Sequence, residues 1–288
     1  EAGTDALAAR LPALHARQLT NVLEKFAAQP RRLGDLKGQY FSTVMFDETY
    51  AQRDGTIKRE TQFPQTPDQW VLSGPHFFVG NPFYNTPRAV CDTNKAYDNL
   101  DLQTLPDDYL PRTNYIPACD PATYRDRTPS VPWVEEGERR ARLVTEYYRF
   151  LSREMLSQSG ERTLIGTLLP PGPGNVHTCI QQIFKSTRDL MSFFIGALSL
   201  PVDFQVKSTG AGHANKSVIA KFPVIDLQGN QRYAAMVRAL SLVALTRHYA
   251  CLWEECWEDV FGKQHWATRD PIAALPQNFF ANLTPEWQ

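Results

Sequence analysis

The feature that most constrains the fold is a proline-dense stretch, residues 47–132, that also carries many aromatic side chains. Eleven of the 21 prolines lie there. Proline has no backbone N–H, so it rarely sits inside a long helix or a central strand, and regular elements in this stretch must be short. A disordered linker would lack the aromatic residues. The stretch therefore predicts an ordered framework of short strands and long, packed loops.

The flanking segments show the periodicities of regular structure. Apolar residues recur near helical spacing in residues 4–28, 186–198 and 230–260, and Gln29-Pro30 ends the first of these runs. Aromatic and β-branched runs favour strands at residues 40–46, 142–151, 162–169 and 175–184, although 142–151 also permits a helix. The Pro/Gly turn at 170–174 is expected to join the last two strands.

These elements predict an α+β fold: a mixed β-sheet with long ordered loops, packed by helices, and a helical C-terminus. We divide the chain into an N-terminal connector helix (1–35), an α/β domain (36–228) and a C-terminal helical segment (229–288). The chain of 288 residues is long enough for a substantial core. It starts at Glu1 and shows no signal-peptide pattern, so we expect a fragment or a processed chain.

The charge is balanced overall but unevenly placed. The formal net charge is −1, whereas a protein that binds DNA alone usually has a basic excess. Residues 137–162 hold six arginines against four glutamates, and residues 185–221 hold five cations against two aspartates. The C-terminal helix is acidic. We expect one basic face, so that a nucleic-acid role would rest on that face with help from another module.

The cysteines and the hydropathy both point to the cytoplasm. The five cysteines are widely spaced and form no CxxC pair, which is typical of reduced thiols and argues against a zinc site. No apolar run approaches the roughly 20 residues that a membrane span needs. We therefore expect a cytoplasmic chain with no membrane partner and no metal.

No catalytic motif is complete. Asn81-Pro82-Phe83 resembles the (Asn/Asp)-Pro-Pro-(Tyr/Phe) loop of amino-methylating DNA methyltransferases, but the second proline is absent and a simple turn is favoured. His177 and Cys179 would share one face of a strand and leave a hydrolase as an open alternative. The segment 203–207 has Gln205 where a nuclease needs an acid. We expect no catalytic residue in this chain.

Several strings together carry a resemblance to a known family. They are YAQRDGTIKRE at 50–60, WVLSGPHFFVGNP at 70–82, LPDDYLPRTNY at 105–115, ERTLI at 161–165 and LPVDF at 200–204. Across most of residues 40–225 the chain resembles the C-terminal specificity half of large DNA adenine methylases of type II restriction systems. Fused type IIG restriction–methylation enzymes and DISARM-type phage-defence methylases are similar.

The resemblance implies a function shared between two parts of a larger protein. In that family an upstream methyltransferase domain binds S-adenosylmethionine and methylates adenine N6, and the C-terminal domain recognises double-stranded DNA. Residues 36–228 would then be the target-recognition domain. This chain has neither the Gly-rich cofactor loop nor the complete catalytic loop, so we expect no cofactor in it and no methylation by it alone.

Cations and amides that can reach phosphates or base edges are the candidate DNA-binding residues. They are Arg53, Lys58, Arg59, Arg88, Arg112, Lys207, His213, Asn215 and Lys216. Arg112 and Arg162 are equally interpretable as buried arginines paired with Asp107, Asp108 or Glu161. A second class of function is a protein-docking domain that uses Trp253 and Trp257, although tryptophans four apart on a helix are commonly core residues.

Overall fold

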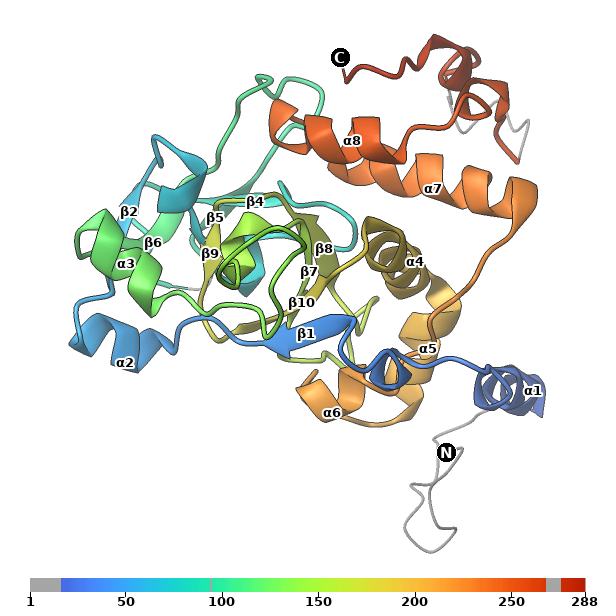
Figure 1. The fold of residues 1–288 in the computed structure, drawn as a ribbon, viewed down its shortest axis with the longest axis horizontal. Coiled ribbons are helices and arrows are strands. Elements are labelled where there is room, and N and C mark those ends of the chain that lie inside the picture. The colour runs from blue at the N-terminus through green and yellow to red at the C-terminus, as the bar shows by residue number, and fades with distance from the viewer. Residues whose placement is uncertain (1–16, 94, 268–275, 288) are drawn as a thin grey trace, which may run out of the picture.

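The computed structural model describes residues 17–93, 95–267 and 276–287. The predicted α+β fold is confirmed: two four-stranded sheets and one two-stranded sheet lie beside each other, and helices pack around them (Figure 1). Among the described residues no single helix has the length and apolarity to cross a membrane, although the bent pair α4 and α5, which meet at 71°, passes that test together on length and composition alone.

The first sheet is antiparallel throughout. Its strands, in spatial order, are β1 (Tyr40–Thr43), β10 (Cys179–Phe184), β7 (Arg149–Arg153) and β8 (Gly166–Leu169). All six residues of β10 are buried, because helix α4 covers one face of the sheet and the segment 129–148 packs on the other. This sheet therefore has two covered faces, and polar residues such as Gln181 and Gln182 of β10 are buried within it.

The second sheet is mixed. Its strands, in spatial order, are β2 (Ile57–Gln62), β6 (Thr113–Pro117), β3 (Val71–Leu72) and β9 (Gly174–Asn175), and only the β3–β9 pair is parallel. A separate hairpin pairs β4 (Asn85–Pro87) with β5 (Tyr97–Asn99). As the proline density predicts, none of the strands drawn from residues 47–132 exceeds six residues.

Eight α-helices accompany the sheets in the described part of the chain. They are α1 (Arg17–Ala27), α2 (Glu48–Arg53), α3 (Pro121–Arg127), α4 (Thr187–Leu198), α5 (Leu200–Ser208), α6 (Lys216–Ile219), α7 (Gly229–Val243) and α8 (Ala250–Cys256). Side chains cap several of them: Asp47, Asp120 and Ser186 each accept a bond from the first turn of α2, α3 and α4. Helix α4 lies between the first sheet and α7 (Figure 1).

One large apolar core joins the elements. It runs in sequence from Leu33 to Phe280 and includes an edge-to-face contact between Phe150 and Phe193, with ring centroids 5.2 Å apart. Fully burying a side chain of this kind stabilises the fold by roughly 1.5–3 kcal/mol. The core draws on all three of the segments proposed from sequence, and the boundaries at 35/36 and 228/229 stay predictions.

Two strand predictions need correction. The strand expected at 142–151 begins only at Arg149, after a 3-10 turn at Val144–Glu146. The strands around the turn at 170–174 exist, but they do not form a hairpin, because β7 lies between β8 and β10. The cause is Gly174, whose backbone N–H donates to the carbonyl of Trp70 (2.9 Å) and carries the chain into the second sheet.

The helix predictions are mostly confirmed, with one division. Helix α1 accounts for residues 17–27 of the first prediction, and residues 4–16 lie outside the described residues. The long C-terminal helix is split into α7 and α8. At the break, the N–H of Arg247 donates to the carbonyl of Asp107 (2.8 Å), and the hydroxyl of buried Tyr249 donates to the carbonyl of Leu168 (2.9 Å). These tertiary bonds replace helical ones. Helices α5 and α6 were not predicted.

Candidate nucleic-acid interface

The nine residues predicted to face DNA lie in two groups on different elements. Five of them surround the second sheet and the β4–β5 hairpin, and we name these the β2-side cations: Arg53, Lys58, Arg59, Arg88 and Arg112. The other four, Lys207, His213, Asn215 and Lys216, lie on or between α5 and α6. In Figure 1 strand β2 is at the left of the molecule, and α6 lies below β1.

Most β2-side cations have a partner within the chain. Lys58 pairs with Glu60 (2.5 Å) and Arg88 pairs with Asp98 (2.8 Å). The guanidinium of Arg59 donates to the carbonyl of Cys91 (3.0 Å). These exposed ion pairs add little stability, but each carboxylate cancels the field of its cation. Lys58 and Arg88 are therefore poor phosphate-binding groups. Arg53 lies over the ring of Tyr50, 5.5 Å from its centroid, and makes no ion pair with a described residue.

Arg112 has a structural role. Its guanidinium lies 4.5 Å from the ring centroid of Phe63 and donates to the carbonyl of Pro87 (3.4 Å). It pairs with none of the acids considered from sequence, since Asp108 binds Arg247 instead (2.8 Å). The side chain thus ties the β4–β5 hairpin to the end of β2.

The α5–α6 group is mixed. Lys207 donates to the carbonyl of Gly160 (3.2 Å), and His213 contacts Glu154 (2.9 Å). Asn215 caps helix α6, because its side-chain oxygen accepts from the N–H of Val218 (3.0 Å). Lys216 differs from the other three. It has no acidic partner among the described residues.

An aromatic cluster on the first sheet organises a set of cations of which the sequence reasoning named only Lys216. Phe41, Trp133 and Tyr147 pack with Val131, Val144 and Ile183, on the face of the sheet opposite α4. The ammonium of Lys185 lies 5.5 Å from the ring centroid of Trp133, that of Lys216 lies 5.9 Å from Phe41, and the guanidinium of Arg142 lies 6.0 Å from Tyr147. An aromatic ring positions a cation without cancelling its charge.

Three more arginines extend this surface. We name the whole set the arginine–lysine face: Arg125, Arg139, Arg140, Arg142, Lys185 and Lys216. Arg139 and Arg140 are exposed and make no ion pair with any residue that the structure describes. Five of its six members come from the two basic segments noted in the sequence, and Arg125 comes from α3. That was the available signal, but only the fold brings the segments together.

The acids on this face leave a cationic excess. Glu138 pairs with Arg142 (2.5 Å) and Glu146 pairs with Arg125 (3.1 Å). Glu135 accepts hydrogen bonds from the hydroxyl of Tyr147 (2.6 Å) and the indole of Trp133 (2.9 Å), and these bonds hold the pKa of its carboxyl below the ordinary value. With exposed Glu136, four acids stand against six cations.

The other arginines of residues 137–162 are turned inward. Arg149 is fully buried and has no carboxylate partner among the described residues. Its guanidinium donates to the side-chain oxygen of Gln181 (2.8 Å) and to the carbonyls of Pro170 (3.2 Å) and Pro173. Burial lowers its pKa to about 10. It therefore holds the proline turn in place. Arg153 donates to the carbonyl of Phe77.

Arg162 is a buried structural arginine, as one interpretation allowed, but its partner is Asp203 (3.5 Å). The same carboxylate accepts from the backbone N–H groups of Thr163 (2.9 Å) and Leu164 (2.7 Å). This gives Asp203, in the segment first compared with a nuclease motif, a structural role. It fixes the chain that leads into β8.

The two catalytic candidates have structural explanations. In the loop at Asn81, the side-chain oxygen accepts from the N–H of Phe83 (2.9 Å), and the ring of Phe83 is buried against Trp70, with centroids 5.9 Å apart. It is not placed to stack on a flipped base. Cys179 is fully buried, and burial raises the pKa of its thiol to about 12, so it is no activated nucleophile. His177 instead accepts from the N–H of Glu48 (3.1 Å).

The C-terminal tryptophans contribute to packing. Trp253 is 6% exposed and its indole donates to the carbonyl of Thr284 (2.9 Å), while Trp257 packs edge-on against Phe261. Trp253 is therefore a core residue, whereas Trp257 is partly exposed. All five cysteines are free, and the described residues contain no cluster of three or more potential metal ligands.

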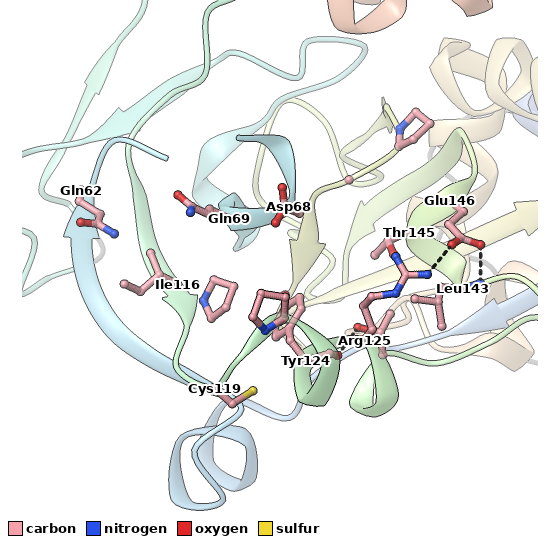
Figure 2. A pocket seen from close by; sticks show the side chains of 15 residues that line it. Gln62, Asp68, Gln69, Ile116, Cys119, Tyr124, Arg125, Leu143, Thr145 and Glu146 are labelled. Carbon is pink, nitrogen blue, oxygen red and sulfur yellow. Dashed lines mark hydrogen bonds and ion pairs between the residues drawn. The ribbon is translucent and has the colours of Figure 1, made fainter. Parts of the chain in front are cut away.

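A hollow of about 750 Å³ adjoins the arginine–lysine face (Figure 2). Strands β2 and β6 and the turn at Pro67–Gln69 form one side of it, and α3 with the segment 143–146 forms the other. Arg125 and Glu146 lie on its rim. A second hollow of about 530 Å³ shares Glu146 and is lined by Arg139, Arg140 and Arg142. The two hollows therefore adjoin each other at Glu146, and arginines line both of them.

A search of protein-family models found no match to this chain, and a search of curated proteins found none either. The relationship to DNA adenine methylases therefore stays a prediction from the resemblance of the sequence strings.

Proposed function

We propose that this chain is the sequence-specific, double-stranded DNA recognition module of a multidomain, S-adenosylmethionine-dependent DNA adenine methyltransferase that acts in restriction–modification or phage defence in the cytoplasm. The observation that carries the proposal is the arginine–lysine face. Of its six cations, Arg142, Lys185 and Lys216 lie over the rings of one aromatic cluster, and Arg139 and Arg140 line a hollow together with Arg142, on a chain whose net charge is only −1.

Phosphate binding explains such an arrangement physically. Each cation that neutralises a phosphate releases counterions, and this release supplies most sequence-independent affinity for DNA. Guanidinium groups also bind phosphate in a bidentate manner. Arg139 and Arg140 are the strongest candidates, since they are exposed and have no acidic partner in the described chain.

The hollow beside the face supplies groups of the kind that read bases. Gln62 and Gln69 line it, and amide side chains can bond adenine in a bidentate manner. Phosphate contacts by the face would set the register, and amides in the hollow would supply discrimination. This division of work is what a recognition module requires.

Catalysis belongs to another domain in this proposal. The Asn81 loop and Cys179 are occupied by structural contacts and burial. An upstream methyltransferase domain would bind S-adenosylmethionine and carry the reaction, and the module would need no cofactor. That partner domain would also share the phosphate contacts, which is why a nearly neutral module suffices.

The test is duplex binding against salt concentration, with a matched pair of double variants. Wild-type chain should bind a mixed-sequence duplex weakly, with an affinity that falls as salt rises. Arg139→Ala with Arg140→Ala should weaken binding about tenfold and reduce the salt slope by about 2, at about one per lost phosphate contact.

The control is Lys58→Ala with Arg88→Ala, which removes the same charge from the β2 side and should bind like wild type. Salt-independent binding, or equal losses in the two double variants, would contradict the proposal.

A further inference from the structure

The hollow beside the arginine–lysine face has the features of a binding site for a small, flat, polar group. Its volume of about 750 Å³ falls within the range of small-molecule pockets. Its apolar walls include the rings of Pro117, Pro121 and Pro171, which offer flat faces. Its polar groups are few and come from two opposed sides. Figure 2 shows Asp68 and Gln69 on one side, and Tyr124 and Arg125 on the other.

Tyr124 is the most informative lining residue. Its side chain is 8% exposed, yet its hydroxyl has no hydrogen-bond partner within the residues described. Burial raises the pKa of this hydroxyl above its ordinary value, so it is a neutral group able to donate or accept. Because this oxygen is also sealed from solvent, the hydroxyl lies behind the wall of the hollow, and the ring of Tyr124 is the part that lines it. A Cβ on Gly174 would come within 2.7 Å of this oxygen, so glycine is what leaves room for it.

Asp68 and Gln69, from one short turn, add an acceptor and a donor to the lining of the hollow. The Gln69 side-chain oxygen accepts from the N–H of Gln65 (3.0 Å), which leaves its amide N–H groups as donors toward a ligand. The carboxylate of Asp68 makes no ion pair with any described residue and can only accept. The Gln69 donor and the Asp68 acceptor are complementary to a nucleobase edge on which a ring nitrogen accepts and a neighbouring exocyclic amine donates.

Arg125 provides a position for a phosphate. Its guanidinium pairs with Glu146 (3.1 Å), but the two side chains are 54% and 36% exposed, so the pair is weak and exchangeable. Glu146 also borders the second hollow, which Arg139, Arg140 and Arg142 line. A nucleic-acid backbone that follows the arginine–lysine face would therefore pass the mouth of the first hollow.

We infer that this hollow receives one unpaired adenine or cytosine, the bases whose exocyclic amine adjoins an unprotonated ring nitrogen on the Watson–Crick edge, while Arg125 binds its phosphate. The amine donates to Asp68, the adjacent ring nitrogen accepts from Gln69, and the proline rings pack on the base. The inference rests on the proposed function and deepens it, because it adds an unpaired base to the duplex that the face binds. Thymine, which has no amine, is rejected.

The experiment compares three duplexes of one sequence by fluorescence anisotropy: fully paired, with one unpaired adenine, and with one unpaired thymine. The full chain should bind the adenine duplex about tenfold more tightly than the thymine duplex, the discrimination of one good bidentate contact. Asp68→Ala and Gln69→Ala should each abolish this preference, and Asp68→Ala should leave affinity for the paired duplex unchanged.

Gln65→Ala is the matched control, since Gln65 is exposed on the same turn and does not line the hollow. It should keep the preference. Tyr124→Phe should also keep the preference, because the hydroxyl is sealed from solvent and lies behind the wall of the hollow. Loss of the preference in either of these variants would contradict the roles assigned to Asp68 and Gln69.

The outcomes separate this inference from the proposed function. Salt-dependent binding of the paired duplex with equal affinity for unpaired adenine and thymine overturns the inference alone. If no duplex binds, the proposed function fails. Saturation-transfer NMR with deoxyadenosine monophosphate then still tests the hollow: transfer to the base protons that Asp68→Ala removes supports it, and no transfer overturns it.

Discussion

The arginine–lysine face and the β2-side cations contain the same residue types, yet they differ in what surrounds them. On the β2 side, Lys58 and Arg88 each have a carboxylate within 2.8 Å, and Arg59 and Arg112 donate to backbone carbonyls. Arg53 and Arg112 lie over the rings of Tyr50 and Phe63. On the face, Arg125 and Arg142 have carboxylate partners, but Lys185 and Lys216 lie over aromatic rings and have no acidic partner among the described residues. A carboxylate cancels a charge, whereas a ring only places it. Whether a cation can bind a ligand therefore depends more on the group that it already contacts in the chain than on whether it is a lysine or an arginine.

The comparison also explains how a nearly neutral chain can present a basic surface. The β2-side cations find their acids close by, either two residues along a strand or across a hairpin. The cations of the face come from α3, the 139–142 segment, the end of β10 and α6. The packing of Phe41, Trp133 and Tyr147 brings together the last three of these segments. Several predictions can break or sharpen this contrast, and the largest effect concerns a cation that belongs to neither region.

Replacing Arg149 by Leu should destabilise the fold by about 3 kcal/mol or more, because buried acceptors at Gln181, Pro170 and Pro173 lose their donor. Chemical denaturation with guanidinium chloride measures this loss. Arg139→Leu, in the same basic segment but exposed, should change stability by no more than about 0.5 kcal/mol. Equal losses would remove the distinction between inward and outward arginines.

Acid should destabilise the fold through His76, which lies in the turn Gly74–His76 between β3 and β4. This imidazole is fully buried, donates or accepts at Ser73, and has its pKa lowered from 6.5 to about 4 by burial. The unfolded chain therefore binds the proton more readily, so stability is complete above pH 6.5 and falls as the pH drops toward 4. The loss should reach on the order of 3 kcal/mol.

Urea midpoints recorded across this pH range for wild type and His76→Gln test the assignment. The substituted chain should lack most of the acid-dependent decline. An identical decline in both chains would place the responsible group elsewhere.

Removing both lysines of the face, Lys185→Ala with Lys216→Ala, should weaken duplex binding about fivefold and reduce the salt slope by about 1 to 2. The effect should be smaller than for Arg139 with Arg140, because an ammonium binds phosphate as a point charge without a bidentate contact. Thermal stability should stay nearly constant. If the double variant binds DNA as tightly as wild type, these lysines do not contact DNA.

The smallest effect is expected for single substitutions of the β2-side pairs. Glu60→Gln frees Lys58 and Asp98→Asn frees Arg88, so each should leave stability within about 0.5 kcal/mol. If the comparison is right, freeing these cations should strengthen duplex binding slightly, by less than about twofold. A strong gain would show that the β2 side approaches DNA closely.

The sequence predicted local structure better than it predicted the site. The density of prolines predicted that strands in residues 47–132 would be short, and apolar spacing located α4 and α7. Proline content and apolar periodicity are local properties of the chain. The pairing of β8 was missed, since β7 enters between β8 and β10 through long-range contacts. The division of α7 from α8 also depends on a distant loop, through the bond from Arg247 to Asp107.

The same limit applies to the cations. Residues 137–162 are visibly basic, but nothing local separates Arg149, which binds buried carbonyls, from Arg140, which is exposed. Lys216 was identified as a candidate, whereas Lys185 was not, because its neighbour Trp133 is 52 residues away in the chain. Charge runs reveal where cations are abundant, and only tertiary packing decides which of them are available.

Lysine footprinting tests the central claim most directly. The intact chain is acetylated with and without saturating duplex DNA at low salt, and the modification of each lysine is measured by mass spectrometry. The account predicts that Lys185 and Lys216 lose reactivity when DNA is bound, while Lys58, with 54% of its side chain exposed, reacts equally in both samples. Protection of Lys58 with undiminished reactivity at Lys185 and Lys216 would contradict it.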